Sequence, residues 1–392
     1  MNDPNLAGRD PHLAGRACRD PFADDPRAHY DALQREPLSR NEAGRWVVAR
    51  HADAVAVVTD PDTYSSHVSR FLQVPNGLDG AAHREARQLL DPFFSADRMA
   101  ALAPLLEEVA DGLLAGVTPG HPLDAVRDLG SVYAVRAQSV WLGWPAELEP
   151  ELLAWMDDNH AATRSGELSR TAAVAHRFDA IIHRLLSIRR LRRPGRPADL
   201  TEELMGVRHH DGRPLGEDEI VSVLRNWTGG DLGSLALCTG VTLYWFATHP
   251  ELPDELIAAS DDEFDLAVDE ILRIDDPFVS NRRVATRYAV LHDQAIAPGE
   301  QLVVNWTAAN RDPAVFPDPD AYDPHGHAAA NLVYGTGPHV CPGRPLATLE
   351  LRVLLRAVAR GHRVRLAPGT TPEREQPPVG GFRRVPVILD PR

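Results

Sequence analysis

The residues best suited to chemistry surround Cys341. Residues 334–344 read Tyr-Gly-Thr-Gly-Pro-His-Val-Cys-Pro-Gly-Arg, so glycines stand on both sides of the cysteine. Glycine adopts positive φ without strain and lets the backbone approach a flat ligand closely. A helix predicted from Pro345 would stabilise negative charge on the sulfur through its N-terminal amides. The spacing therefore favours a thiolate that can ligate iron.

Taken alone, a single cysteine beside a glycine-rich turn is more often a buried structural residue. A helical binding module with a structural cysteine is therefore one alternative. What alters this balance is a resemblance to a known family that also covers four further residues of types that can donate to a carboxylate. They are His83 and Arg87, four residues apart on a predicted helix, together with Arg283 and His339.

The order of these residues resembles a known family. The run aromatic, Gly, x, Gly, x, His, x, Cys, x, Gly is similar to the haem-binding signature of cytochromes P450, and the resemblance extends from about Pro21 to the C-terminus. It implies haem b as cofactor, with Cys341 as the iron ligand and His83, Arg87, Arg283 and His339 binding the haem propionates. One departure is Tyr334, where the family usually has Phe, and its hydroxyl needs a partner.

A second motif supports the resemblance. Glu270 and Arg273 match the family's Glu-x-x-Arg pair, and acid and base at this spacing share a helix face. In the family the pair fixes the irregular segment that leads to the cysteine loop, here within 309–320. The family often has Arg directly afterwards, whereas this chain has Ala321. We expect His325 or a backbone carbonyl to be the third partner.

The predicted long helix carries the unusual part of the sequence. Residues 227–234 read Trp-Thr-Gly-Gly-Asp-Leu-Gly-Ser, and glycines inside a helix cost about 1 kcal/mol each relative to Ala. In the family this helix crosses the haem and opens locally where O2 binds, although close packing against a flat neighbour would also explain the glycines. Ser234 stands where most relatives have Thr, and Gly233 where they have an acid.

The nearest acid to that position is Asp231, an arrangement similar to the haem domains of self-sufficient bacterial P450s. The resemblance makes Asp231 and Ser234 candidates for proton relay, since a hydroxyl can hold a water and a carboxylate can feed a proton. A weakened relay would favour radical coupling over oxygen insertion. The two residues also weigh against the second alternative, a non-catalytic haem sensor.

These residues must be positioned by a mainly helical chain with small sheets. Apolar spacing predicts helices over 100–114, 172–188, 217–249, 263–273 and 345–360, a helix starting at Asp53, a strand over 45–49, short strands over 284–304 and a β-hairpin in the tail. The basic run 189–195 is predicted as a solvated turn. The resemblance implies the P450 fold, and no linker or repeat divides the chain, so 1–392 is expected to be a single haem domain.

Composition excludes several classes of protein. Lys+Arg is 41 and Asp+Glu is 56, a net charge of −15 that argues against nucleic-acid binding. Three widely spaced cysteines, Cys18, Cys238 and Cys341, form neither a disulfide framework nor a zinc pattern and suit a reducing cytoplasm. The polar start has no signal peptide, and no apolar run reaches 18 residues, so we expect a cytoplasmic monomer without a membrane segment.

The resemblance implies an O2-dependent monooxygenase. Because the chain ends at Arg392, soon after the haem domain, we expect electrons from NAD(P)H through an external ferredoxin and its reductase, or a flavodoxin. Basic residues could steer such an acidic partner, namely Arg98, Arg344, Arg352 and Arg356. Matching family regions place the substrate near 71–79, 156–160, 278–280 and 380–382. We expect a small molecule or small peptide of secondary metabolism, hydroxylated or oxidatively cross-linked.

Overall fold

The computed structural model describes residues 25–192 and 195–392. The polar N-terminus and Cys18 lie outside the described residues. The helices are α1 (Arg27–Leu33), α2 (His51–Thr59), α3 (Gly80–Leu90), α4 (Ala96–Leu114), α5 (Val132–Leu142), α6 (Glu149–Ser165), α7 (Leu168–Arg190), α8 (Leu200–Met205), α9 (Glu217–Thr248), α10 (Leu252–Ala258), α11 (Asp261–Ile274), α12 (Trp306–Ala309), α13 (Pro324–His327) and α14 (Arg344–Gly361). The strands are β1 (Leu38–Arg40), β2 (Trp46–Val48), β3 (Tyr64–Ser65), β4 (Pro122–Asp124), β5 (Ser280–Ala285), β6 (Ala289–Leu291), β7 (Gln294–Ile296), β8 (Gln301–Asn305), β9 (His362–Leu366), β10 (Glu373–Arg374), β11 (Phe382–Arg384) and β12 (Pro386–Pro391).

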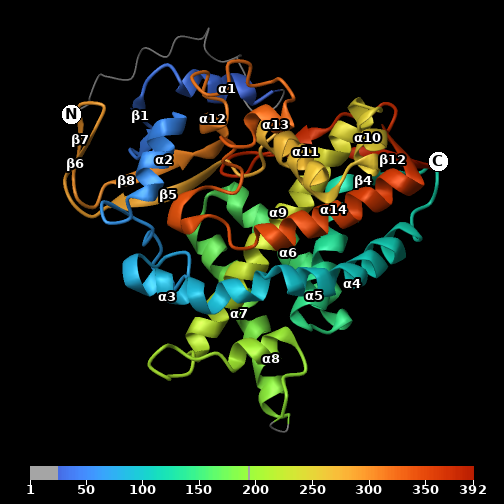
Figure 1. Cartoon of the computed structure of the whole chain (residues 1–392), viewed down its shortest axis with the longest axis horizontal. Coiled ribbons are helices and arrows are strands. Elements are labelled where there is room, and N and C mark those ends of the chain that lie inside the picture. The colour runs from blue at the N-terminus through green and yellow to red at the C-terminus, as the bar shows by residue number, and fades with distance from the viewer. Residues whose placement is uncertain (1–24, 193–194) are drawn as a thin grey trace, which may run out of the picture.

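The mainly helical fold with small sheets is confirmed. Helices fill most of the molecule, while β5 and β8 lie at one side next to α2 (Figure 1). The sheet at that side has the order β1-β2-β8-β5-β3, and β9, β12 and β4 form a second sheet. The predicted hairpin of the tail is the antiparallel pair β10 and β11. Pairing of β5 with β8 sets Arg283 opposite Leu302 and so fixes the position of this cation.

Helix α9 is the central element. It starts where the Glu219 carboxylate accepts a hydrogen bond from the Gly216 amide at 2.6 Å, and it ends before Pro250. The helix packs closely on the π-helical turn Ala125–Ser131, where a Cβ on Gly130 would lie 2.7 Å from the Ala236 carbonyl oxygen. The expected local opening of this helix is wrong, because α9 is continuous from Glu217 to Thr248. Burial of its neighbours offsets the cost of the glycines.

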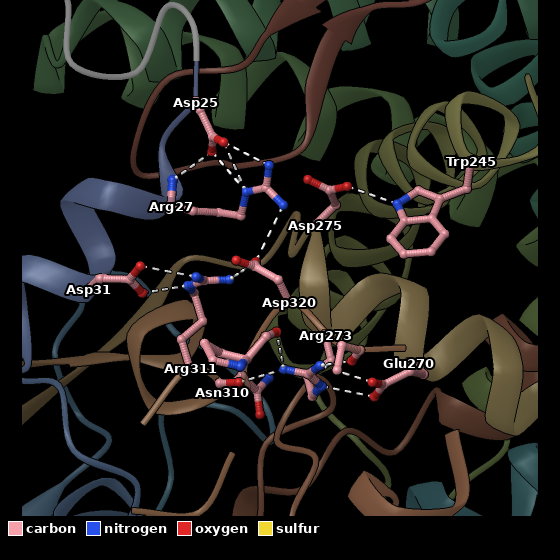
Figure 2. Close-up of polar contacts among 12 residues, drawn as sticks. Asp25, Arg27, Asp31, Trp245, Glu270, Arg273, Asp275, Asn310, Arg311 and Asp320 are labelled. Carbon is pink, nitrogen blue, oxygen red and sulfur yellow. Dashed lines mark hydrogen bonds and ion pairs between the residues drawn. The ribbon is translucent and has the colours of Figure 1, made fainter. Parts of the chain in front are cut away.

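The Glu270 and Arg273 side chains form a buried pair that anchors the segment before the cysteine loop (Figure 2). The Arg273 guanidinium donates to both Glu270 oxygens, at 2.8 and 2.9 Å. It also donates to the backbone carbonyls of Asn310, Pro319 and Ala321 at 2.9, 3.0 and 3.2 Å. The expected backbone partner is therefore present at three places, which explains why a side chain at position 321 is not needed.

The prediction that His325 is the third partner of the Glu270 and Arg273 pair is wrong. Its Nε2 lies 3.0 Å from Glu263 on the surface. His327 takes the place instead, with Nδ1 2.7 Å from Glu270 Oε1, and the Asp323 amide donates to the same oxygen at 3.1 Å. The sequence could not separate two histidines two residues apart, because only the turn of α13 decides which one faces inward.

The basic run 189–195 differs from its predicted solvated turn. Arg189 and Arg190 belong to α7, and Arg189 is buried, with its guanidinium bonded to Asp199 at 3.0 Å and to the Gly143 carbonyl at 2.6 Å. Arg193 and Pro194 lie outside the described residues. Pairing with the partly buried Asp199 carboxylate decides the location of the first arginine of the run, and periodicity does not report that pairing.

Replacing Arg273 with Ala should destabilise the protein strongly, because it leaves the buried Glu270 carboxylate without its counterion. We expect the free energy of unfolding to fall by about 3–5 kcal/mol in urea denaturation of the haem-loaded protein. Arg177→Ala is the matched control, because Arg177 pairs with Asp158 on the surface, and it should cost at most about 1 kcal/mol. Equal losses in the two variants would contradict the anchoring role of Arg273.

Candidate active site

A cavity of about 370 Å³ lies between the middle of α9 and the cysteine loop. Cys341 and Gly343 line one wall of it, and Gly230, Asp231 and Ser234 of α9 line another. Nothing comes within 4 Å of the position that a Cβ on Gly230 would occupy, so the helix surface is open there. The predicted cysteine and the predicted distal residues therefore face one shared space.

The cysteine loop holds its shape through backbone contacts. Gly335 and Gly337 have φ of 68° and 73°, which strongly favour glycine, and a Cβ on Gly337 would lie 3.2 Å from the Val58 carbonyl oxygen. The Cys341 amide donates to the Tyr334 carbonyl at 3.0 Å. Arg87 binds the loop from α3, donating to the carbonyl of Val340 at 3.0 Å and to that of Pro338 at 3.1 Å.

The environment of the Cys341 thiol balances two effects. Burial raises its pKa, whereas the backbone amides of Gly343 and Arg344, at the start of α14, lower it. A bound metal ion would deprotonate such a thiol outright. Nearby, a hydrogen bond from the Tyr334 hydroxyl lowers the pKa of the Asp269 carboxyl. Burial has the larger effect and raises that pKa to about 6. The partner that the departure from Phe requires is thus Asp269.

One rim of the cavity gathers the Arg283 guanidinium and the imidazoles of His83 and His339, and Asp79 Oδ1 lies 3.6 Å from His339 Nε2, too far for a hydrogen bond. Arg283 is buried, burial lowers its pKa, and its guanidinium donates to the Arg282 backbone carbonyl at 2.8 Å. The His339 ring lies 4.0 Å from the His83 ring, and its buried Nε2 has no hydrogen-bond partner among the described residues. Burial lowers the pKa of His339 to about 4. Buried polar groups normally have partners, so this rim suits a carboxylate ligand.

These observations test whether the residues fit haem. The Cys341 thiol lies on one side of the cavity, and Gly230 leaves the surface of α9 open on another. Arg283, His83 and His339 line the edge. Arg87 also lines the cavity, but its Nε is bonded to Asp91 at 2.6 Å and the loop carbonyls occupy another nitrogen. The donor set fits an iron porphyrin with Cys341 on the iron and the rim on the propionates.

The Asp231 carboxyl is enclosed. Gln138 of α5 donates to it at 2.6 Å, and Glu350 of α14, fully buried, interacts with it directly. Burial raises the pKa of Asp231 to about 7, and burial together with the neighbouring Asp231 raises the pKa of Glu350 well above its usual range. Two carboxyls in one dry site cannot both ionise, so the pair retains a proton at neutral pH.

Sequence reasoning missed several residues of the site. Gln138 was detectable as a polar residue inside the mostly apolar α5, and Glu350 as an acid on the apolar face of α14. Trp141, Trp227 and Trp306 also line the cavity. Nothing in their spacing distinguishes them from ordinary core residues.

The regions expected to hold substrate reach the cavity in part. Pro75 and Asn76 of the segment 71–79 line the cavity, as does Phe278 of the segment 278–280. Asn281, the residue after that segment, lines it too. Phe382 is instead buried against Tyr244, with ring centroids 4.5 Å apart, and Met156 is buried in the core. The tail around Phe382 and the part of α6 around Met156 therefore lie behind the residues that line the cavity.

Ion pairs neutralise the arginines that were expected to meet a redox partner. Arg352 pairs with Asp265, Arg356 with Asp261 and Arg98 with Glu203, each through a short contact. Arg344 pairs with Asp269 at 2.7 Å, but half of its side chain (51%) is exposed. Arg344 is thus the most accessible of the four cations.

Comparisons with known proteins identify the family of the chain. A family model described as Cytochrome P450 matches residues 264–387. The 6-deoxyerythronolide B hydroxylase of Saccharopolyspora erythraea is 30% identical over 288 residues, covering 71% of this chain and 68% of that protein. The vitamin D(3) 25-hydroxylase of Pseudonocardia autotrophica is 28% identical over 396 residues, covering 95% of each chain.

The solved structure of a P450 EryK mutant in complex with erythromycin B has a TM-score of 0.83 and 25% identity, covering 93% of this chain and 97% of that chain. The chain belongs to the cytochrome P450 family and has its fold. It is accordingly a haem-thiolate monooxygenase. Within the residues that the structure describes, none of the helices is both long and apolar enough to span a bilayer.

Replacing Arg283 with Gln should weaken haem retention, because a propionate would lose its charge-assisted partner, worth about 1.5–3 kcal/mol. We expect haem transfer to an acceptor apoprotein to accelerate on the order of 10- to 100-fold, followed by absorbance. Arg282→Gln is the matched control, since the neighbouring Arg282 is exposed on the same strand. If both variants release haem at the wild-type rate, Arg283 does not bind a propionate.

Proposed function

We propose that this cytochrome P450 hydroxylates or oxidatively couples a small aromatic or small-peptide substrate in secondary metabolism. The observation that carries the proposal is the single cavity in which the Cys341 thiol faces Gly230, Asp231 and Ser234. Related proteins are named as an erythromycin C-12 hydroxylase of Saccharopolyspora erythraea and a cyclomarin C epoxidase of Salinispora arenicola, 29% identical each. Their names support oxygen insertion into natural products.

The proton supply is assigned to Asp231 and Ser234. Haem bound at Cys341 supplies the activation of O2. Ser234 lines the cavity on α9, where its hydroxyl can hold a water molecule at the reacting face. Asp231 lies one helical turn before Ser234 and shares a proton with the Glu350 carboxyl. Gln138 holds the Asp231 oxygen to which it donates a hydrogen bond. A carboxyl with a pKa near the working pH is an efficient proton donor and acceptor.

The substrate wall is held by α9. Ser222 donates to the Leu72 carbonyl at 2.9 Å and accepts from the Val74 amide at 2.8 Å, and Asn226 donates to the Val74 carbonyl at 2.9 Å. These bonds hold the segment that carries Pro75 and Asn76, which line the cavity together with Phe278. Aromatic rings and amide groups, among them Asn281, thus line one cavity and suit a substrate that combines a ring with polar groups.

Electrons are proposed to come from NAD(P)H through a ferredoxin and its reductase, or a flavodoxin. Arg344 follows the cysteine loop and is half exposed, so it is the cation best placed to contact an acidic partner.

The proposed reaction can be tested with the haem-loaded protein, NAD(P)H, a ferredoxin couple and isotopically labelled O2. Aromatic natural products and small peptides are supplied in turn, and products are analysed by mass spectrometry. Hydroxylation adds one labelled oxygen, whereas oxidative coupling removes two hydrogens without adding oxygen. Absence of either product, with NAD(P)H consumption no faster than without protein, would contradict the proposal.

Replacing Ser234 with Ala should uncouple the enzyme, because the water held by the hydroxyl is lost. We expect product formed per NAD(P)H consumed to fall on the order of 10- to 100-fold. Ser234→Thr is the matched control, because it keeps the hydroxyl and should stay within about twofold of wild type. An unchanged ratio in Ser234→Ala would remove Ser234 from the relay.

A further inference from the structure

The three glycines within residues 227–234 of α9 face different surroundings. Gly230 faces the open cavity, as described above. The other two, Gly229 and Gly233, lie four residues apart on one helix face, beneath α6. A Cβ on Gly229 would lie 3.8 Å from the Trp155 ring, and a Cβ on Gly233 would lie 3.0 Å from His160 Nε2. At the position where most relatives have an acid, this chain therefore has an imidazole that reaches across from another helix.

The volume explains why residue 233 is glycine. Real Cβ atoms rarely come as close as 3.0 Å to a neighbouring heavy atom, so a side chain at 233 would require the His160 ring to shift. An acid at 233 and the His160 imidazole thus compete for the same space. Asp231 does not fill this place, because Gln138 of α5 and Glu350 of α14 hold its carboxyl, whereas His160 approaches from α6.

His160 has the chemistry of a proton carrier. Its ring is half-buried and makes no hydrogen bond to any residue within 25–192 or 195–392. Burial lowers its pKa, and among the surrounding charges Glu375 and Asp157 raise it while Arg164 lowers it. Glu375 is itself buried and paired with Arg164 at 3.1 Å. A neutral imidazole has one nitrogen that donates and one that accepts, so it can take a proton from one side and release it on the other.

We propose that His160 replaces the acid missing at position 233 and passes protons from solvent to the hydroxyl of Ser234. Ser234 is the next residue of α9 after Gly233 and lines the cavity, and the proposed route requires water to bridge the His160 ring to the Ser234 hydroxyl. In each transfer one ring nitrogen gives a proton to this water and the other takes one from solvent, with no change of charge overall. The inference rests on the proposed function and names a positioning residue for its proton supply.

The test compares His160→Gln with a variant that has an acid at position 233. It uses the haem-loaded protein with NAD(P)H and a ferredoxin couple. Oxygen consumption is followed against pH in light and heavy water. In parallel, NMR of labelled histidine in the reduced, CO-bound protein gives the pKa of His160 without turnover. We expect the wild-type rate to change at this pKa, below 6.5. His160→Gln should lose that inflection and slow about tenfold or more.

Two further variants separate proton transfer from packing. His160→Ala alone should be slow, and adding Gly233→Asp to it should recover the rate, with the inflection moved to lower pH. Gly233→Asp alone should not gain that lower inflection, because His160 occupies the space. Asp157→Asn removes an exposed charge that raises the pKa of His160, so it should move the inflection to lower pH without slowing the reaction.

The outcomes are distinct. If His160→Gln keeps the wild-type rate, pH profile and solvent isotope effect while Ser234→Ala uncouples, the role of His160 is overturned and the proposed function stands. If the double variant is as slow as His160→Ala alone, His160 acts through packing and the inference is again overturned. If the wild-type protein consumes no O2 with NAD(P)H, the proposed function itself fails, and the NMR titration still shows whether Gly233→Ala changes the pKa of His160.

Discussion

The structure depends on keeping one thiol uncovered at the wall of a buried cavity. An irregular loop presents Cys341, and such a loop has few regular hydrogen bonds of its own. Arg87 binds two of its carbonyls from α3, and Arg273 with Glu270 fixes the segment that precedes it. Both arginines thus act on backbone carbonyls, which any residue supplies. This explains how the anchoring survives Ala321 in place of a charged side chain.

The two faces of the cavity are built by different means. On the thiol side, left-handed glycines and guanidinium groups make a rigid frame, and Arg283 and His339 leave buried donors for a carboxylate ligand. On the α9 side, glycines leave the helix surface open, and Asp231 of α9 is joined by titratable groups from two neighbouring helices, Glu350 from α14 and His160 from α6. Because these groups lie on separate elements, packing rather than local sequence sets the proton supply.

Much of this could be predicted from the sequence. The glycine spacing around Cys341 and the periodicity of α9 and α14 report local backbone requirements, and these were confirmed. The roles of His327 and Gln138 depend on which helix faces pack together, and such contacts cannot be predicted from the pattern of a single sequence. Arg189 illustrates the same limit, since its burial follows from pairing with Asp199 across a turn. The continuous α9 shows that glycines need not open a helix when tight packing holds it.

The central claim is that Cys341 binds haem iron as a thiolate. The most direct test is the absorption spectrum of the reduced, CO-bound protein, together with that of Cys341→His. The wild-type protein should show the red-shifted Soret band of a haem-thiolate protein, and the variant should lose this shift while still binding haem. A wild-type spectrum that matches that of the variant would contradict thiolate ligation and the account built on it.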